Sequence, residues 1–319
     1  MNILNGRNIG IFILLTLAAL LPLGISDYWR YVLTIAFFYI IMASSWNLLA
    51  GYTGQFSLGH HTFAMIGGYV STLLMHYTGA PFWISIPSAI IATAIISLLL
   101  GIVCLRVYGI YLALITWAFA EVVKNYIRLD FAFTGGDRGF QSSLLFGTMK
   151  PLPYYYLFLG LSVFSVVLIT VIMHSRIGYY LRSIREDEIA ARSMGVDITR
   201  YKILAFIIAS SLAGMAGVFY SHSIGLISPM MGDFNEMAMI IIFVVIGGMR
   251  SISGPIVGAI TVRILMEFLR EYSEIRIVIL SAIVIILMRF FSGGIILMVK
   301  RSLKFIQRGK RAPVSAYTE

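Results

Sequence analysis

The chain has 319 residues, of which 59% are apolar and only 12% are charged, and its formal net charge is +10. A soluble domain carries about 25% charged residues, so the composition argues against a soluble enzyme and for a chain that crosses a bilayer several times. Lysine and arginine collect at the ends of apolar segments instead of interleaving with aromatic residues, so the positive charge indicates membrane topology and not nucleic-acid binding.

Ten apolar runs follow one another along the chain. They cover residues 9–25, 31–50, 56–75, 82–105, 107–123, 154–173, 203–224, 237–248, 256–269 and 275–291. The first run has a basic residue before it and small residues after it, an outline that also fits a signal peptide. The eighth run is too short to cross about 30 Å of hydrocarbon as a straight helix. It is either a half-helix or continues into the ninth run through Gly247, Gly248 and Gly254. We therefore predict an all-α, polytopic membrane bundle with eight to ten spans.

The distribution of basic residues sets the expected orientation. With a cytoplasmic amino terminus, sixteen basic residues lie on the inner side and seven on the outer side, which is the bias that the positive-inside rule requires. Both termini are then cytoplasmic. We predict a transmembrane domain over residues 1–300 and a basic tail over 301–319. Two long connections are candidate functional segments, namely an outer loop at 124–153 and an inner segment at 175–202.

Glycine and polar residues interrupt the region of the second and third spans. Such a cluster is costly in lipid unless it faces protein or water, and a broken helix can hold a zwitterion inside a membrane. Close helix packing is the alternative interpretation. The candidate pathway residues are Asn47, Gln55, Ser57, Gly59 and His60. His60 and His61 would point about 100° apart on a helix and have no Cys, Asp or Glu nearby, so we expect no metal site.

Charged residues surround the outer loop. Glu121 and Lys124 are expected to end the fifth span, and Asp137 and Arg138 lie within the loop. They are either solvated or contact a solute receptor outside the membrane. Glu267 is the only acidic residue expected well inside a span, where it would pair with Arg263 one turn away, as a structural pair or a gate.

The inner segment reads as a short amphipathic helix along the cytoplasmic surface. Ile184, Ile189 and Met194 recur with an approximately helical period, residues 185–188 form a polar helical turn, and Gly195 is a plausible C′ residue. Glu188 and Arg192 stand in the favourable acid-then-base order of a helix pair. Such a helix either holds two spans apart or docks into a groove on a cytoplasmic partner. The candidate coupling residues are Arg185, Glu186, Glu188, Ala190, Ala191, Arg192 and Gly195.

Small residues repeat every four positions along the seventh span. A stripe of this kind lets a second helix approach closely, either within the chain or from another subunit. The candidate packing residues are Ala209, Ala213, Gly217 and Ser221, preceded by Ala205.

The chain carries no phosphate-binding loop. The motif G-x-x-x-x-G-K-[ST] cradles phosphates, and Gly309-Lys310 is followed by Arg311 without the earlier glycine. Uphill transport would need another subunit to hydrolyse ATP. The sequence also lacks the converging polar cluster of a membrane enzyme. An ion-coupled secondary transporter would need more intramembrane carboxylates than Glu267 alone.

Four separated blocks resemble the branched-chain amino acid permease family of ATP-binding-cassette (ABC) importers, in its LivM type. They are GYTGQFSLGH at 51–60, GIYLALIT at 109–116 with TGG at 134–136, RSIREDEIAARSMG at 182–195, and GG at 247–248 with SGPIVGA at 253–259. Ile189 stands where the general importer pattern E-A-A-x-x-x-G has Glu.

The resemblance implies a non-enzymatic permease subunit in the cytoplasmic membrane of a bacterium or archaeon. It implies as partners a second, LivH-like permease, two cytoplasmic ATPases that bind ATP and Mg²⁺, and a periplasmic or lipid-anchored binding protein, with no cofactor in this chain. Its implied substrates are leucine, isoleucine and valine. Related permeases for urea or short amides are an alternative, and an ion-coupled secondary transporter is a more distant one.

Overall fold

The computed structural model describes residues 6–104, 107 and 109–272, and then the isolated positions 278–279, 282–283, 285, 289 and 294–295. Its long helices are α1 (Gly6–Gly24), α2 (Asp27–Trp46), α3 (His60–Thr78), α4 (Phe82–Cys104), α5 (Ile110–Leu129), α7 (Pro151–His174), α10 (Ile198–Ile224), α11 (Phe234–Gly247) and α12 (Ser253–Phe268). Shorter elements are the π-helix η1 (Asn47–Thr53), α6 (Phe131–Thr134), the 3₁₀ turns η2 (Gly136–Arg138) and η3 (Pro229–Gly232), α8 (Arg176–Glu186) and α9 (Glu188–Ser193). Strands β1 (Phe140–Gln141) and β2 (Leu226–Ile227) form one antiparallel pair.

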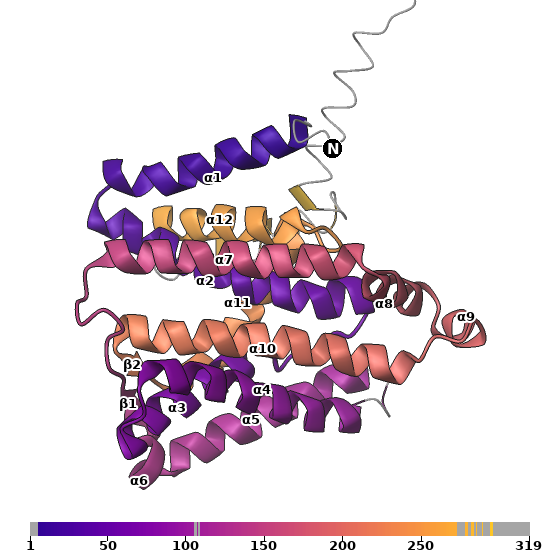
Figure 1. Cartoon of the computed structure of the whole chain (residues 1–319), viewed down its shortest axis with the longest axis horizontal. Coiled ribbons are helices and arrows are strands. Elements are labelled where there is room, and N and C mark those ends of the chain that lie inside the picture. The colour runs from indigo at the N-terminus through magenta and orange to yellow at the C-terminus, as the bar shows by residue number, and fades with distance from the viewer. Residues whose placement is uncertain are drawn as a thin grey trace, which may run out of the picture.

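The predicted all-α membrane bundle is confirmed. Each of the first nine apolar runs forms a helix, and the tenth lies outside the continuously described residues. Five helices in the described part of the chain are long and apolar enough to cross a membrane, namely α2 with η1, α4, α5, α7 and α10. Most long helices lie side by side along one axis (Figure 1). The predicted basic tail at 301–319 lies outside the described residues.

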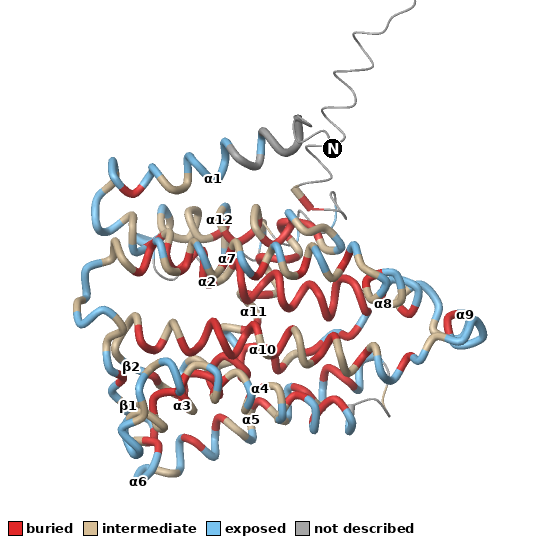
Figure 2. The backbone as a smooth tube through the Cα atoms, in the orientation of Figure 1, coloured by how far each residue is buried: buried red, intermediate tan, exposed pale blue. Residues whose placement is uncertain are grey.

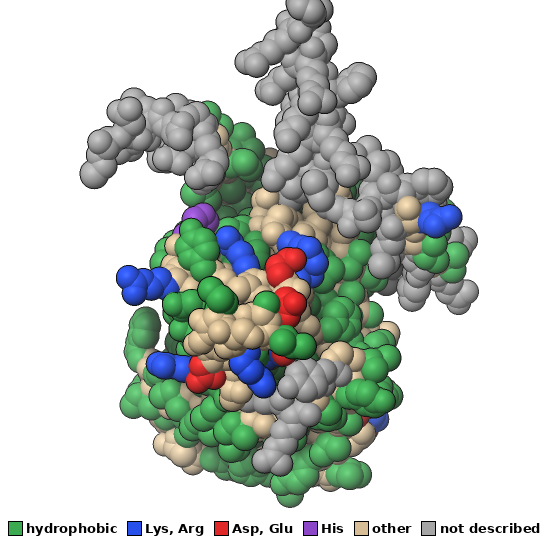
Figure 3. Space-filling view, turned by 90° about the vertical axis from the view of Figure 1, so that its right-hand side faces the viewer, with side chains coloured by type: hydrophobic (Ala, Val, Ile, Leu, Met, Phe, Trp, Pro, Cys, Tyr) green, Lys and Arg blue, Asp and Glu red, His purple; other side chains and the backbone are tan. Residues whose placement is uncertain are grey.

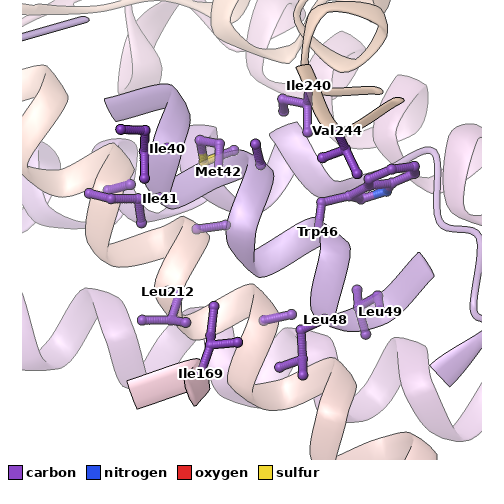
Figure 4. Packing of buried hydrophobic residues seen from close by; sticks show 14 of the residues in the cluster. Ile40, Ile41, Met42, Trp46, Leu48, Leu49, Ile169, Leu212, Ile240 and Val244 are labelled. Carbon is purple, nitrogen blue, oxygen red and sulfur yellow. The ribbon is translucent and has the colours of Figure 1, made fainter. Parts of the chain in front are cut away.

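The second helix forms the centre of the bundle. α2 is buried along most of its length by α7, α10, α11 and α12 (Figure 2). Trp46 at its end points toward Val244 of α11, and Leu48 in the following η1 points the other way (Figure 4). A helix that is apolar all round is a core helix, and in lipid it is held mainly by van der Waals packing.

Glycine brings α3 and α10 into backbone contact. A Cβ on Gly217 would lie 1.9 Å from the carbonyl oxygen of Ala64, and one on Gly67 would lie 2.3 Å from that of Gly214. The predicted small-residue stripe is buried inside this chain, since Ala205, Ala209, Ala213, Gly217 and Ser221 are all buried. The structure therefore uses these residues for packing between its own helices.

The eighth and ninth runs form a tight helical hairpin. α11 has 14 residues, which rise only about 21 Å. A turn then reverses the chain, because a Cβ on Gly258 would lie 1.8 Å from the carbonyl oxygen of Phe243 and one on Gly247 would meet that of Gly254. The half-helix interpretation is confirmed, and the alternative of one helix continuing through these glycines is wrong.

The long connections lie at opposite ends of the bundle. α7 runs between them, from the end that carries β1 and β2 to the end that carries α8 and α9 (Figure 1). We call these the β1–β2 end and the α9 end. α5 continues to Leu129, so the predicted end of the fifth span at Val123 is wrong and the outer connection begins later.

Candidate functional site

The helix of the inner segment is broken at Asp187. This residue is extended, with φ −156° and ψ 111°. Its carboxylate accepts hydrogen bonds from the backbone N–H groups of Ile189 and Ala190, at 2.8 and 3.0 Å. The predicted polar turn over residues 185–188 is therefore wrong: aspartate stabilises a helix start better than a helix interior, so α8 stops before it and α9 starts after it.

Gly195 ends α9. Its φ is +82°, its N–H donates to the carbonyl of Arg192 at 2.9 Å, and the N–H of Val196 donates to that of Ala191 at 3.1 Å. These two bonds form a Schellman motif, which requires the left-handed backbone that glycine adopts most easily. The six-residue helix is thus capped at both ends.

The apolar side chains of the inner segment fall on two faces. Ile184, Ala191 and Ile198 pack together inside the α9 end. Ile189 and Met194 are 81% and 85% exposed. The single apolar face expected for Ile184, Ile189 and Met194 is therefore wrong, because the break at Asp187 resets the helical phase.

An ion pair attaches α9 to α10. Glu188 pairs with Lys202, a largely buried lysine, instead of pairing with Arg192 as predicted. Ala190, Arg192 and Glu186 remain exposed. Figure 3 looks onto this end and shows acidic and basic side chains gathered within a largely hydrophobic rim.

Arg185 lies beside the loop that follows the second span. Its Cγ lies 3.5 Å from where a Cβ on Gly54 would be. Partial burial, reinforced by the nearby Arg250, lowers the pKa of the Arg185 guanidinium. Glu186 lies 4.0 Å from Arg250, in the turn between α11 and α12. The inner segment thus meets both the break after η1 and the α11–α12 hairpin.

A non-helical segment separates the second and third spans, as the glycine pattern predicts. η1 ends at Thr53, Gly54 has a φ of +74°, and α3 begins at His60. The third helix therefore starts four residues later than the predicted apolar run at residue 56. The intervening residues 54–59 are not helical.

This third helix starts inside the bundle. The C-terminal ends of α3 and α10 both lie at the β1–β2 end, where the His76 ring contacts Phe140 and the Gly225 carbonyl accepts from Ser142. Gly67 and Gly214, which touch, are the eighth residue of α3 and the seventeenth of α10. α3 therefore begins nine residues, or about 13 Å, further inside the bundle than α10.

Two of the candidate pathway residues tie the interior break to other parts of the chain. The amide of Asn47 donates to the carbonyl of Ser251 at 3.0 Å and accepts from the N–H of Arg250 at 3.3 Å, so it holds the α11–α12 turn. His60 Nε2 lies 2.9 Å from the hydroxyl of Ser45 on α2.

The other three pathway candidates are buried in the segment itself. Gln55 accepts from the hydroxyl of Thr53, Ser57 accepts from the N–H of Gly59, both at 3.3 Å, and a Cβ on Gly59 would lie 2.4 Å from the carbonyl oxygen of Thr116. All five candidates are buried and contact protein.

More charged residues lie inside helices than expected. Glu121 and Lys124 are within α5, and Glu236 of α11 accepts a hydrogen bond from Tyr39 at 2.7 Å. The expectation that Glu267 is the only acidic residue inside a span is therefore wrong. Its predicted pairing with Arg263 is confirmed, at 3.6 Å.

The β1–β2 end holds an open pocket of about 910 Å³. Arg138 lines it and stacks over Phe131 at 5.9 Å. Asp137 faces Arg128 instead, at 2.5 Å, and this hydrogen bond lowers the pKa of the Asp137 carboxyl. The sequence predicts both residues in the loop but does not reveal the pocket.

A buried histidine that the sequence pattern does not single out supports this pocket. His222 lies 2.8 Å from the hydroxyls of both Ser71 and Ser142, and it therefore joins α3, α10 and the outer loop. A histidine flanked by Ser221 and Ser223 near the end of a span was the available signal.

Comparisons with known proteins agree on one family. Residues 28–299 match the family model for the permease component of branched-chain amino acid transport systems. The high-affinity branched-chain amino acid transport permease LivM of Escherichia coli is 31% identical, and that of Salmonella typhimurium is 30% identical, each over 91% of this chain and 75% of the relative. The LivH permease of Salmonella typhimurium is 25% identical over 81% of this chain and 91% of the relative. No solved structure matches the chain.

Proposed function

The chain belongs to the branched-chain amino acid permease family, and on this basis we propose that it is a membrane-embedded permease subunit of an ABC importer for leucine, isoleucine and valine. Its helices would form the translocation pathway, and its own role would be transport without catalysis. The LivM relative of Escherichia coli is 31% identical to this chain and the LivH relative of Salmonella typhimurium is 25% identical. Because the identity to LivM is higher, we assign the chain the LivM-like place beside a second, LivH-like permease.

The exposed tip of α9 is the observation that carries the proposal. Ile189 and Met194 project from a short helix capped at both ends. Two large apolar side chains this exposed, outside the spans, fit a protein partner that would bury them. A cytoplasmic ATPase is that partner in our proposal. Arg185, Glu186, Glu188, Ala190, Ala191, Arg192 and Gly195 would form the coupling segment with them.

ATP hydrolysis would belong to two such partner subunits. The sequence around Gly309 and Lys310 lacks the arrangement that cradles phosphates. ATP-driven closure of the ATPases would push on α9 and rock the bundle between inward-open and outward-open states.

The interior break would convert this push into movement of the pathway. Arg185 lies beside Gly54, where the non-helical segment begins. We assign Asn47, Gln55, Ser57, Gly59 and His60 to an inner gate, because they link this segment to α2, α5 and the α11–α12 turn.

The β1–β2 end would receive a binding protein from outside the cytoplasmic membrane. Its open pocket, lined by Arg138, suits an acidic side chain of such a receptor. The α9 end would then face the cytoplasm, together with both termini, as the positive-inside rule predicts.

Affinity purification of the tagged chain from its native membrane tests the proposal. ATPase subunits and a second permease should co-purify, and a leucine-loaded receptor should stimulate ATP hydrolysis by the assembly. In the variant Ile189→Glu/Met194→Glu, recovery of the ATPases should fall at least about tenfold, because charged groups replace the buried apolar contacts.

Met149→Glu is the matched control, since Met149 is a 75% exposed methionine at the opposite end; it should leave recovery of the ATPases unchanged. Full recovery of the ATPases with the double variant would contradict the assignment of α9. A chain that purifies alone and moves solute under an ion gradient without ATP would overturn the importer proposal.

A further inference from the structure

Three charged side chains meet between α5 and α11. The ammonium of Lys124 lies 2.7 Å from the Glu121 carboxylate and 3.4 Å from the Asp233 carboxylate. With one positive and two negative groups, this ionic cluster carries a net negative charge. It is distinct from the coupling segment and from the interior break.

The ionic cluster lies well inside the bundle. Lys124 and Glu121 are five and eight residues before the end of α5, about 7 and 12 Å along the helix. On the other side, α11 begins at Phe234, and its Glu236 bonds Tyr39, the thirteenth residue of α2. The two α5 residues and Asp233, which directly precedes α11, therefore all lie at membrane depth.

The carboxylates are open to one face of the chain. The Lys124 side chain is only 10% exposed, whereas those of Glu121 and Asp233 are 30% and 45% exposed. An ionised carboxylate facing hydrocarbon is strongly unfavourable, so intramembrane charges face protein or a water-filled path. This face of α5 and α11 must therefore border other protein or a water-filled path, and not lipid.

An aromatic pair adjoins the carboxylates. Trp117, one turn before Glu121 on α5, lies 6.3 Å from Phe234, which follows Asp233. The two rings are 41% and 44% exposed. An anionic region beside an exposed apolar wall is complementary to a ligand with a cationic end and an apolar end.

A buried histidine beside the ionic cluster lacks one hydrogen-bond partner. His61 is 2% exposed, contacts the Gly232 carbonyl through Nε2 at 3.0 Å, and has no hydrogen-bond partner for Nδ1 among the described residues. A ligand or water bound at the ionic cluster would supply the partner that this nitrogen lacks.

We propose that the ionic cluster and the Trp117–Phe234 pair form a substrate contact on the translocation pathway. The Glu121 and Asp233 carboxylates bind the ammonium group of an amino acid, and the aromatic rings contact its branched side chain. Lys124 holds the two carboxylates at this spacing. This inference rests on the proposed function, because it takes the substrate to be an apolar amino acid.

Leucine uptake by the complete reconstituted assembly tests the contact. Asp233→Asn should lower the uptake rate about tenfold, the value of one lost charge-assisted hydrogen bond, while the ATPases remain bound. Asp27→Asn is the control, since it makes the same change at an exposed residue paired with Arg30, and it should transport normally. Unchanged uptake by the Asp233 variant would overturn the proposal.

A second variant distinguishes substrate binding from a purely structural ion network. If the ionic cluster only neutralised charge within the chain, the triple variant Glu121→Gln/Lys124→Met/Asp233→Asn, in which no charge of the cluster remains unpaired, would take up leucine normally. A substrate contact predicts that the triple variant stays impaired. Normal uptake by the triple variant would therefore overturn the proposal.

Thiol labelling tests the water-filled path independently of the solute. In a background with the single cysteine changed, Cys104→Ala, we expect Asp233→Cys to react with a charged thiol reagent in membrane vesicles. Val122→Cys, at a 67% exposed position on α5, should not react. Glu121→Cys serves if the first variant fails to fold, and protection of these cysteines from the reagent would overturn the inference. If labelling succeeds but the wild-type assembly moves no leucine, the path stands and the proposed substrate falls.

Discussion

Gly217 and Gly67 matter because of what a side chain would displace at each position. Both face a backbone carbonyl at a distance that no Cβ tolerates. The spacing of small residues on α10 predicts a close helix contact, but it does not reveal that the partner is α3 of the same chain. That knowledge needs the fold, since Ala64 is far away in sequence.

Replacing Gly217 with alanine should force α3 and α10 apart and lower the free energy of unfolding by about 2–3 kcal/mol. Gly160→Ala is the matched control, because a Cβ at Gly160 of α7 meets nothing within 4 Å. Thermal denaturation in detergent should show a lowered midpoint for the first variant alone. Equal midpoints would show that the contact relaxes without cost.

Asn47 offers a second test at this scale. Asn47→Leu removes both hydrogen bonds to the α11–α12 turn and leaves two backbone groups unpaired, which should cost about 2–3 kcal/mol. Ser44→Ala is the control, since the buried Ser44 hydroxyl has no hydrogen-bond partner in the described structure. Hydrogen exchange over residues 248–252 should rise in the Asn47 variant only. Unchanged protection there would mean that the turn is stable without the two Asn47 hydrogen bonds.

The apolar pattern predicts which helices form far better than it predicts where each helix ends. Nine runs became nine helices because a bilayer rewards continuous apolar stretches. The end of α5 was predicted too early because Lys124 looked like a boundary. In the fold its charge meets Asp233, more than one hundred residues later, a pairing that local pattern cannot contain. The break at Asp187 was missed for the opposite reason, since a strong local cap outweighed the helical period.

The attachment of α9 can be tested through its ion pair. Glu188→Gln leaves the nearly buried Lys202 ammonium without its carboxylate, so α9 should detach more readily, by about 1–2 kcal/mol after allowance for the partial exposure of Glu188. Hydrogen exchange over residues 188–196 should increase.

Two controls accompany this measurement. Glu186→Gln, at an exposed residue 4.0 Å from Arg250, should change exchange little. The double variant Glu188→Gln/Lys202→Met should recover protection, because it removes both charges of the pair together. Continued high exchange in the double variant would show that packing, and not charge, had been lost.

The two ends of the whole molecule give a direct test of orientation. Ser143 lies exposed near the outer pocket, and Ser193 lies exposed on α9. Each is replaced separately with cysteine in the Cys104→Ala background. A membrane-impermeant thiol reagent added to intact cells should label the first and spare the second, since the positive-inside rule places α9 in the cytoplasm. The reverse pattern would invert the topology and place α9 out of reach of a cytoplasmic ATPase.

The backbone contact between α3 and α10 also has a mechanical consequence. Side chains between two helices can normally change rotamer and repack when one helix tilts. At Gly67 and Gly217 no side chain separates the two backbones, so we expect α3 and α10 to move together as one rigid unit. The two helices differ in length toward the α9 end, because α3 begins about 13 Å further inside the bundle than α10. A force applied where α10 begins is therefore delivered to the deeper end of α3, in the interior of the membrane, without first being lost in side-chain rearrangement.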